Sequence, residues 1–322
     1  MNHAFSRCLL VGLWLTGWGP AALTAQTPAA PDRQPEATSL LGQPLVPPPP
    51  ATQLVDQLKQ REKAHRARPD DPDALIWYGR FLAYNGRYRD AVTVFSQGVA
   101  QFPDDPRMLR HRGHRYITLR QFDKAIADFD QAVKLIEGQP DEIEPDGMPN
   151  LRNIPVSTLQ GNIWYHKGLA HYLNQDMPAA LAAYRKCRSL GTNDDNTVST
   201  THWIYMILRR MGRPAEASQA VQDITADMDI IENFSYHQAC RFYREGGPGP
   251  PETQASQTGQ ASTPADDALQ YAVGNWYLYS GDPRRARRMF ERLVTGGNWA
   301  TFGHIAAEAD LARMNAEAES GR

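Results

Sequence analysis

The 322-residue sequence has little cysteine, no excess of either charge and, beyond its N-terminal segment, no long hydrophobic run. Because 34 Lys and Arg residues stand against 36 Asp and Glu residues, a strongly basic nucleic-acid-binding protein is excluded, and we expect no nucleic acid partner. No later stretch approaches the roughly 18 apolar residues of a membrane-spanning helix. Three cysteines are too few for a cysteine-rich metal motif.

The sequence also lacks the common catalytic motifs. It contains no G-x-S-x-G, H-E-x-x-H, P-loop or G-x-G-x-x-G pattern. We therefore predict that the protein is not an enzyme and uses no cofactor. One alternative stays open, an enzyme or enzyme subunit acting on cell-envelope polymers, because a proline-rich segment at 140–160 carries acidic side chains that could include a catalytic pair. These residues are Asp141, Glu142, Glu144 and Asp146.

The first 25 residues have the pattern of a secretory signal peptide. Arg7 lies in a short charged region, an apolar run begins at Cys8, and small residues ending at Ala25 indicate cleavage there. We therefore expect a periplasmic or secreted mature chain with no membrane span after signal cleavage. Residues 26–50 are rich in Pro, Ala, Gln and Thr, and we predict a disordered leader because they cannot bury enough apolar area.

Two cysteines, Cys187 and Cys240, remain after the signal peptide is removed. An oxidising compartment would permit a disulfide between them. Burial as two separate thiols is the simpler interpretation, because cysteine behaves as a small apolar residue.

A pattern of small and aromatic residues repeats along the chain with a shift of 34 residues, from Pro72 to Pro106. In each copy, a small residue at the eighth place and an alanine at the twentieth let two helices approach closely. Aromatic side chains fill the space between the helices. The first copy contains Leu75, Tyr78, Gly79, Leu82, Tyr88, Ala91, Phe95 and Gly98, and the second contains Leu109, Gly113, Tyr116, Phe122, Ala125, Phe129 and Ala132.

The same pattern divides residues 51–245 into helical pairs, interrupted at 140–160 by an insertion whose four prolines prevent a continuous helix. A low-complexity tract predicts a flexible loop at 246–266, and a last repeat with a capping helix follows at 267–317. The repeats expected within 51–245 are a half-repeat at 52–71, four full repeats at 72–105, 106–139, 161–194 and 198–231, and a helix at 232–244.

This pattern resembles the tetratricopeptide repeat (TPR), W-x2-L-G-x2-Y…A-x3-F…P, which has the same period. The resemblance covers roughly residues 52–317 and implies an all-α fold, a right-handed α-solenoid of helix-turn-helix repeats. It also implies a protein that binds a protein or peptide partner in a concave groove lined by the first helix of each repeat. The stretches EPDGMPN and AAEADLAR resemble those of exported bacterial TPR proteins of unassigned function.

The resemblance further implies which side chains face the groove. In the family, the second, fifth, sixth, ninth and twelfth places of each first helix tend to point inward. Carried over to this sequence, these places make the groove basic, histidine-rich and aromatic. The residues expected to contact the partner are Arg80, Arg110, His111, His114, Asn162, Tyr165, His166 and His202.

The run RMLRHRGHRY in the second repeat concentrates four arginines and two histidines in one short helix. Guanidinium groups pair bidentately with carboxylates and phosphates, so we expect an anion site there and an acidic partner segment. Protonated histidines would tighten such binding as the pH falls toward about 6. We predict no metal site, but two alternatives remain: a solvated charged helix, and a metal-dependent binder whose ligands are His111, His114 and His166.

Overall fold

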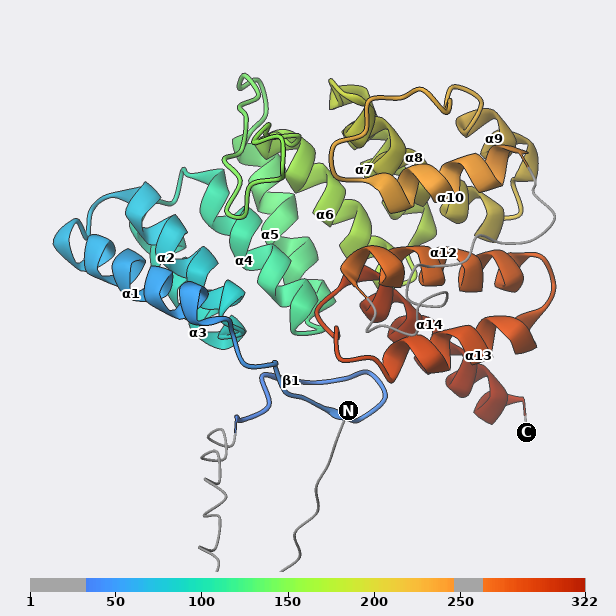
Figure 1. The fold of residues 1–322 in the computed structure, drawn as a ribbon, viewed down its shortest axis with the longest axis horizontal. Coiled ribbons are helices and arrows are strands. Elements are labelled where there is room, and N and C mark those ends of the chain that lie inside the picture. Colours follow the sequence, from blue (N-terminus) through green and yellow to red (C-terminus); the bar gives the residue numbers. More distant parts are fainter. Residues whose placement is uncertain (1–32, 246–262, 322) are drawn as a thin grey trace, which may run out of the picture. The chain divides into compact units, whose positions relative to one another are not determined.

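The structure, a computed structural model, describes residues 33–245 and 263–321, which form thirteen helices and one two-stranded sheet (Figure 1). The helices follow one another as antiparallel pairs, so the predicted all-helical solenoid is confirmed. They are α1 (Thr52–Ala67), α2 (Pro72–Tyr84), α3 (Tyr88–Gln101), α4 (Pro106–Thr118), α5 (Phe122–Leu135), α6 (Leu159–Leu173), α7 (Met177–Leu190), α8 (Asp194–Arg210), α9 (Pro214–Ala220), α10 (Phe234–Glu245), α12 (Pro264–Tyr279), α13 (Pro283–Val294) and α14 (Phe302–Ser320).

In the first two full repeats, the first helix begins where an aspartate precedes a proline. The Asp71 carboxylate accepts hydrogen bonds from the backbone N–H groups of Asp73 and Ala74 at the start of α2. Pro72 occupies the first helical position, where no backbone N–H is needed. Asp105 caps α4 in the same way, so a short local sequence fixes both helix starts.

A glycine of the first helix faces an aromatic ring of the second helix in each of four repeats. A Cβ atom added at Gly79 would lie only 2.5 Å from Cζ of Phe95, so no side chain fits there unless the ring moves. The close helix approach expected from the repeating pattern is thus confirmed. The same relationship joins Gly113 to Phe129, Gly168 to Tyr184 and Gly274 to Phe290.

The turn between the paired helices needs a residue with positive φ. Gly86, Gly212 and Gly281 hold this place with φ of 74°, 71° and 88°. Arg120 and Gln175 adopt the same conformation in the second and third repeats, with φ of 62° and 63°. A residue with a Cβ atom pays about 1–2 kcal/mol for this backbone conformation.

The last helix, α14, contacts more than the final repeat. It packs against α12 and α13 and also reaches α6 (Figure 1). Two ion pairs with buried carboxylates join it to earlier repeats: Glu308 binds Arg120 at 2.8 Å, and Asp310 binds Arg210 at 2.7 Å. The C-terminal helix therefore does more than cover the last repeat, because it also contacts earlier repeats.

The prediction that the leader at 26–50 is disordered is wrong for its second half. Strand β1 (Ala37–Thr38) pairs antiparallel with β2 (Pro44–Leu45), and the hairpin packs on Leu119 and Trp299. The indole N–H of Trp299 also donates to the carbonyl of Val46 at 2.9 Å. Apolar partners supplied by distant helices order the segment, and its composition could not reveal them.

Several boundaries differ from the sequence expectation. Helix α8 begins at Asp194 rather than at 198, and α9 has only seven residues. The predicted flexible loop at 246–266 is helical at its end, because Thr263 caps α12 from Pro264 onward. The rest of that loop and the predicted signal peptide lie outside the described residues. Within the described ranges, no helix is both long and apolar enough to span a membrane.

Candidate functional site

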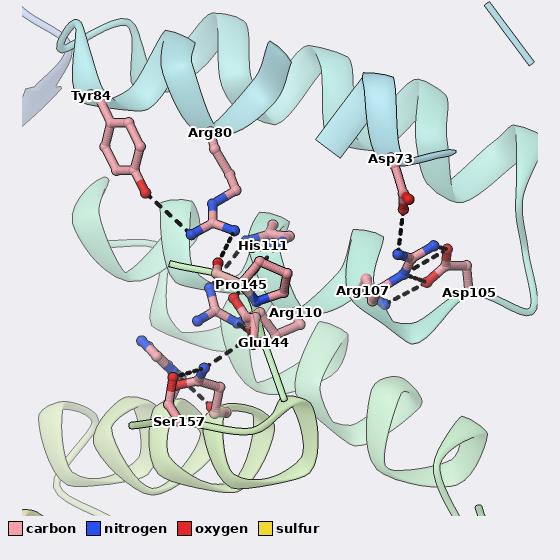
Figure 2. Close-up of polar contacts among 12 residues, drawn as sticks. Asp73, Arg80, Tyr84, Asp105, Arg107, Arg110, His111, Glu144, Pro145 and Ser157 are labelled. Carbon is pink, nitrogen blue, oxygen red and sulfur yellow. Dashed lines mark hydrogen bonds and ion pairs between the residues drawn. The ribbon is translucent and has the colours of Figure 1, made fainter. Parts of the chain in front are cut away.

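The insertion, residues 140–158 in the structure, connects α5 to α6 and folds back upon itself. The backbone N–H of Glu144 donates to the carbonyl of Ser157 at 3.1 Å, and the N–H of Leu159 donates to Glu142 at 2.8 Å. This short pairing brings the acidic half of the insertion against the first helices of the first three repeats, α2, α4 and α6 (Figure 2). We call the face made by these three helices the A-helix face.

The Glu144 carboxylate lies at the centre of a polar cluster on this face (Figure 2). Arg110 Nε lies 2.9 Å from Glu144 Oε2, and both side chains are only 10% exposed. The amide of Asn162 donates to the same oxygen at 3.0 Å, and His111 Nε2 lies 3.8 Å from the other oxygen. Three of the predicted residues, two from the second repeat and one from the third, therefore converge on one carboxylate from this chain.

Arg80 holds the next residue of the insertion. Its guanidinium donates to the carbonyl of Pro145 at 2.8 Å and to the hydroxyl of Tyr84 at 3.3 Å. It also stacks over Trp77, with Cζ 4.5 Å from the ring centroid. Gly147 fits closely against the Tyr84 hydroxyl, where a Cβ atom would clash. An extended acidic stretch from 144 to 147 thus lies on the A-helix face.

Arg107 is engaged with neighbouring acids at the edge of this face. Its guanidinium binds Asp105, which caps its own helix α4, and Asp73 of α2, both at 2.6 Å (Figure 2). Asp73 and Arg107 occupy the second place of consecutive repeats, so the repeat period itself pairs them. Arg107 is therefore compensated by two carboxylates.

Burial changes the protonation of the groups in the cluster. Desolvation lowers the pKa of His111 well below its usual value, and the nearby Arg110 lowers it further. Desolvation also sets the pKa values of His114 and His166 well below their ordinary range. These shifts count against the expectation that protonated histidines tighten binding near pH 6, because burial disfavours the charged imidazole.

A cavity of about 310 Å³ lies further along the A-helix face, lined by aromatic, hydroxyl and amide groups. His166 contacts His114 on one side, with ring centroids 4.4 Å apart, and Phe302 of α14 on the other. The Tyr165 hydroxyl accepts a hydrogen bond from the indole of Trp203 at 2.8 Å. Three of the predicted residues are thus partly covered by the C-terminal helix.

His202 lies apart from the cluster around Glu144. It is almost fully buried between the rings of Tyr236 and Tyr243 and receives a contact of 3.3 Å from the Tyr243 hydroxyl. Desolvation lowers its pKa to about 3. His202 was predicted to contact the partner, but this packing makes it a core residue: it stabilises the contact between α8 and α10.

The metal-binding alternative gains no support from the geometry. His111 stacks on Phe95 and turns its Nε2 toward Glu144, while His114 and His166 face each other. Among the residues that the structure describes, no group of three or more His, Cys, Asp and Glu side chains is placed to hold a metal ion.

The two cysteines are buried and free. The thiol of Cys187 donates to the carbonyl of Gly161 at 3.3 Å, and that of Cys240 donates to Val198 at 3.5 Å. Burial raises both thiol pKa values, that of Cys187 to about 12. Each thiol therefore behaves as a small buried side chain in its own repeat.

Three functional candidates escaped the sequence reasoning. The sequence places Glu144 only in an acidic segment, although it is the carboxylate that Arg110 binds. Arg115 and Tyr84 line a small cavity beside Arg110. The signal for Arg115 was present in RMLRHRGHRY, but the groove positions of the family pattern do not include its place in the helix.

Two models of the tetratricopeptide repeat match the chain, at residues 58–111 and 107–138. Together with the recurring glycine–aromatic packing, they identify tetratricopeptide repeats over residues 58–138 and support a protein of the tetratricopeptide-repeat family. Its repeats define a scaffold for protein–protein interaction. The class thus follows from the fold and from the matched repeats.

Solved structures of other TPR proteins are similar at low sequence identity. The crystal structure of YrrB, a TPR protein with an unusual peptide-binding site, is 15% identical, with 78% of this chain and 96% of that chain covered and a TM-score of 0.42. A TPR protein from Parabacteroides merdae is 15% identical, with 80% and 92% covered and a TM-score of 0.46. A comparison with curated protein sequences finds no match to this chain.

Proposed function

We propose that this protein is a non-catalytic scaffold that binds an extended, acidic segment of a partner protein on the A-helix face. One observation carries the proposal: Arg110 and Asn162 hold the Glu144 carboxylate while Arg80 holds the adjoining Pro145 carbonyl. Side-chain recognition of an acid is thus combined with recognition of the backbone beside it. An acidic segment of a partner would use the same donors.

In this proposal Glu144 stands in for the acidic residue of a partner. Each hydrogen bond to a charged group contributes about 1.5–3 kcal/mol, so the cluster can select for a carboxylate. Because the insertion belongs to the same chain, it competes at a high effective concentration. A partner must displace the insertion. The apparent affinity is therefore the intrinsic affinity multiplied by the fraction of molecules in which the site is free.

The test measures binding of a labelled peptide with the sequence of residues 141–147, DEIEPDG, by fluorescence anisotropy. We expect weak binding to the unmodified chain and tighter binding to two variants that release the insertion. Glu144→Gln removes the charge that Arg110 binds. Gly147→Val leaves every charge in place but clashes with Tyr84. Arg110→Gln should abolish binding in either background.

Glu142→Gln is the matched control, because the Glu142 side chain is exposed and its replacement changes the net charge equally. Its peptide affinity should equal that of the unmodified chain. Raised salt should weaken binding to both release variants. Absence of peptide binding to all variants, or equal binding with and without the Arg110 side chain, would reject the proposed site.

A second function keeps one observation in its favour, catalysis by acids of the insertion. Oδ2 of Asp146 is buried without a hydrogen-bond partner, and burial raises the pKa of Asp146, with Glu232 and Glu144 adding to the rise. A carboxyl group with a raised pKa can act as a general acid. Loss of envelope-polymer turnover on Asp146→Asn would support this function, and unchanged turnover would remove it.

For localisation, we propose export to the periplasm or the medium. The support is the apolar segment that begins at Cys8 and ends before the small residues up to Ala25. Fusing residues 1–30 to alkaline phosphatase, which is active only after export, gives the test. Phosphatase activity that depends on the apolar run supports export, and an inactive fusion rejects it.

A further inference from the structure

A cavity of about 120 Å³ lies beside the Glu144 cluster, between α2 and α4. Three arginines line it: Arg80, Arg110 and Arg115. Tyr84 adds a hydroxyl group, and two imidazoles, both neutral, complete the wall. Such a small space rarely holds three guanidinium groups, because like charges repel strongly away from water.

The charges of this cavity are not balanced within the described part of the chain. Glu144 pairs with Arg110, whereas Arg80 is bonded only to the Pro145 carbonyl and the Tyr84 hydroxyl. For Arg115, the described neighbours that influence its ionisation are Tyr88, Tyr84 and the other two arginines, with no carboxylate among them. Asp146 lies close enough to Arg80 to interact with its charge, so three arginines face two carboxylates, and Arg115 is the one without a carboxylate among the described neighbours.

Arg115 remains charged despite this environment. Burial lowers its pKa to about 10, which still leaves the guanidinium protonated at neutral pH. A desolvated charge without a counterion is costly, and arginine is rarely withdrawn from water unless it is paired. Arg115 is only partly exposed, its guanidinium lies over the Tyr88 ring, and it lines the cavity without a carboxylate among its described neighbours.

We propose that this cavity binds a tetrahedral oxyanion, phosphate or sulfate, either free or carried on the bound segment of a partner. The inference deepens the proposed function, since it names the ligand chemistry next to the carboxylate position. Guanidinium groups bind such oxyanions through parallel hydrogen bonds, and a phosphate with about −1.5 to −2 charges would offset the excess positive charge at Arg115. The volume admits a group of that size beside Glu144.

The test is calorimetric titration of the full chain with inorganic phosphate, with sulfate, and with sodium chloride at matched ionic strength. We expect saturable binding of phosphate and sulfate but not of chloride. Arg115→Gln should weaken phosphate binding by at least about tenfold. Arg66→Gln is the matched control, because the Arg66 side chain is 76% exposed and lies outside the cavity; its phosphate affinity should not change.

Stability without ligand separates a binding role of Arg115 from a structural one. If Arg115 is an unpaired cation awaiting an anion, Arg115→Gln should leave the melting temperature in phosphate-free buffer equal or higher, and phosphate should no longer raise it. If Arg115 were a structural residue, its loss would lower the melting temperature without ligand. That result, or undiminished phosphate binding by Arg115→Gln, would overturn the inference.

Two peptides distinguish the sources of the oxyanion. We compare DEIEPDG with the same peptide carrying phosphoserine at the place of Glu144, using the Gly147→Val chain. Tighter binding of the phosphopeptide than of free phosphate assigns the anion to the partner segment, and equal binding assigns it to the free ion. Failure of the unphosphorylated peptide counts against the proposed function alone, whereas failure of phosphate counts against this inference alone.

Discussion

The carboxylate of Glu308 lies 2.8 Å from the guanidinium of Arg120, and both side chains are at most 2% exposed. Arg120 also donates to the carbonyls of Thr118 and Trp299. The backbone N–H of Leu40 donates to Glu308, so the N-terminal hairpin joins the same network. One buried ion pair thus connects the second repeat, the last helix and the hairpin.

The first prediction concerns this pair. Glu308→Ala should destabilise the protein by about 3–5 kcal/mol, because it leaves the Arg120 guanidinium buried without its counterion. Urea denaturation followed by circular dichroism measures the loss. The control is Glu62→Ala, which breaks the largely exposed pair with Arg66 and should cost no more than about 1 kcal/mol. Equal losses in both variants would contradict the central role of the buried pair.

The second prediction concerns the glycine–aromatic contact. Gly79→Ala should destabilise the protein by about 1–3 kcal/mol, because the added methyl group meets the Phe95 ring inside a packed core. Gly297→Ala is the control, since nothing lies within 4 Å of an added Cβ there, and it should change stability by less than about 0.5 kcal/mol.

A double-mutant cycle checks the mechanism of this effect. Phe95→Leu removes the ring, so the penalty of Gly79→Ala should shrink in that background by more than about 0.5 kcal/mol. Additive losses from the two substitutions would show that the ring is not what excludes a side chain at Gly79.

The third prediction is a loss of stability in mild acid. The pKa of His202 is about 3 in the folded chain and near 6.5 when unfolded, so below about pH 6.5 the unfolded state binds more protons. The stability contributed by the neutral imidazole is therefore complete above pH 6.5 and decreases as the pH falls. The decrease is up to about 1.4 kcal/mol per pH unit. The buried His111, His114 and His166 act in the same direction.

Urea denaturation at pH 7.5, 6 and 5 measures this dependence. His202→Phe should make the slope between pH 6 and 5 shallower by about 1.4 kcal/mol per unit, whatever its effect at pH 7.5. A variant with the slope of the unmodified chain would mean that His202 is already protonated in the fold or reached by water.

The fourth prediction concerns the thiols. In a Cys8→Ser chain, an aromatic disulfide reagent should label neither Cys187 nor Cys240 in the folded state and both in denaturant, because burial withholds the reactive thiolates. The melting temperature should not respond to a reductant. Rapid labelling of one thiol in the native protein, or a reductant-sensitive melting temperature, would contradict the buried thiol assignment.

The repeat pattern placed some of the predicted contact residues correctly and failed for others. Arg110, His111 and Asn162 came together as the family positions implied, because the repeat period alone sets which side chains share the A-helix face. His202 followed the same rule but is enclosed by Tyr236 and Tyr243 from α10. The repeat pattern does not predict this burial, because the two tyrosines come from a helix that departs from the repeat.

The sequence also did not predict that the acidic insertion covers the A-helix face. The sequence shows that the acidic stretch 141–146 belongs to an insertion. Its position against α4 depends on the backbone pairing of Glu144 with Ser157 and on the ion pair between Glu144 and Arg110. The rings of His114 and His166 likewise contact Phe302, which belongs to the last helix. Charge and composition indicated the chemistry of each segment but not which other segment of the chain it contacts.

The sequence alone determined the repeat, the helix pairs and the close contact between Gly79 and Phe95, because these depend on interactions within about 34 residues that recur in phase. Only the tertiary structure decided that Glu144 fills the arginine cluster and that Glu308 reaches Arg120 across 188 residues. Contacts at such separation have no period and depend on where the whole chain turns. The fold was therefore readable from local pattern, whereas the occupancy and charge balance of the site were not.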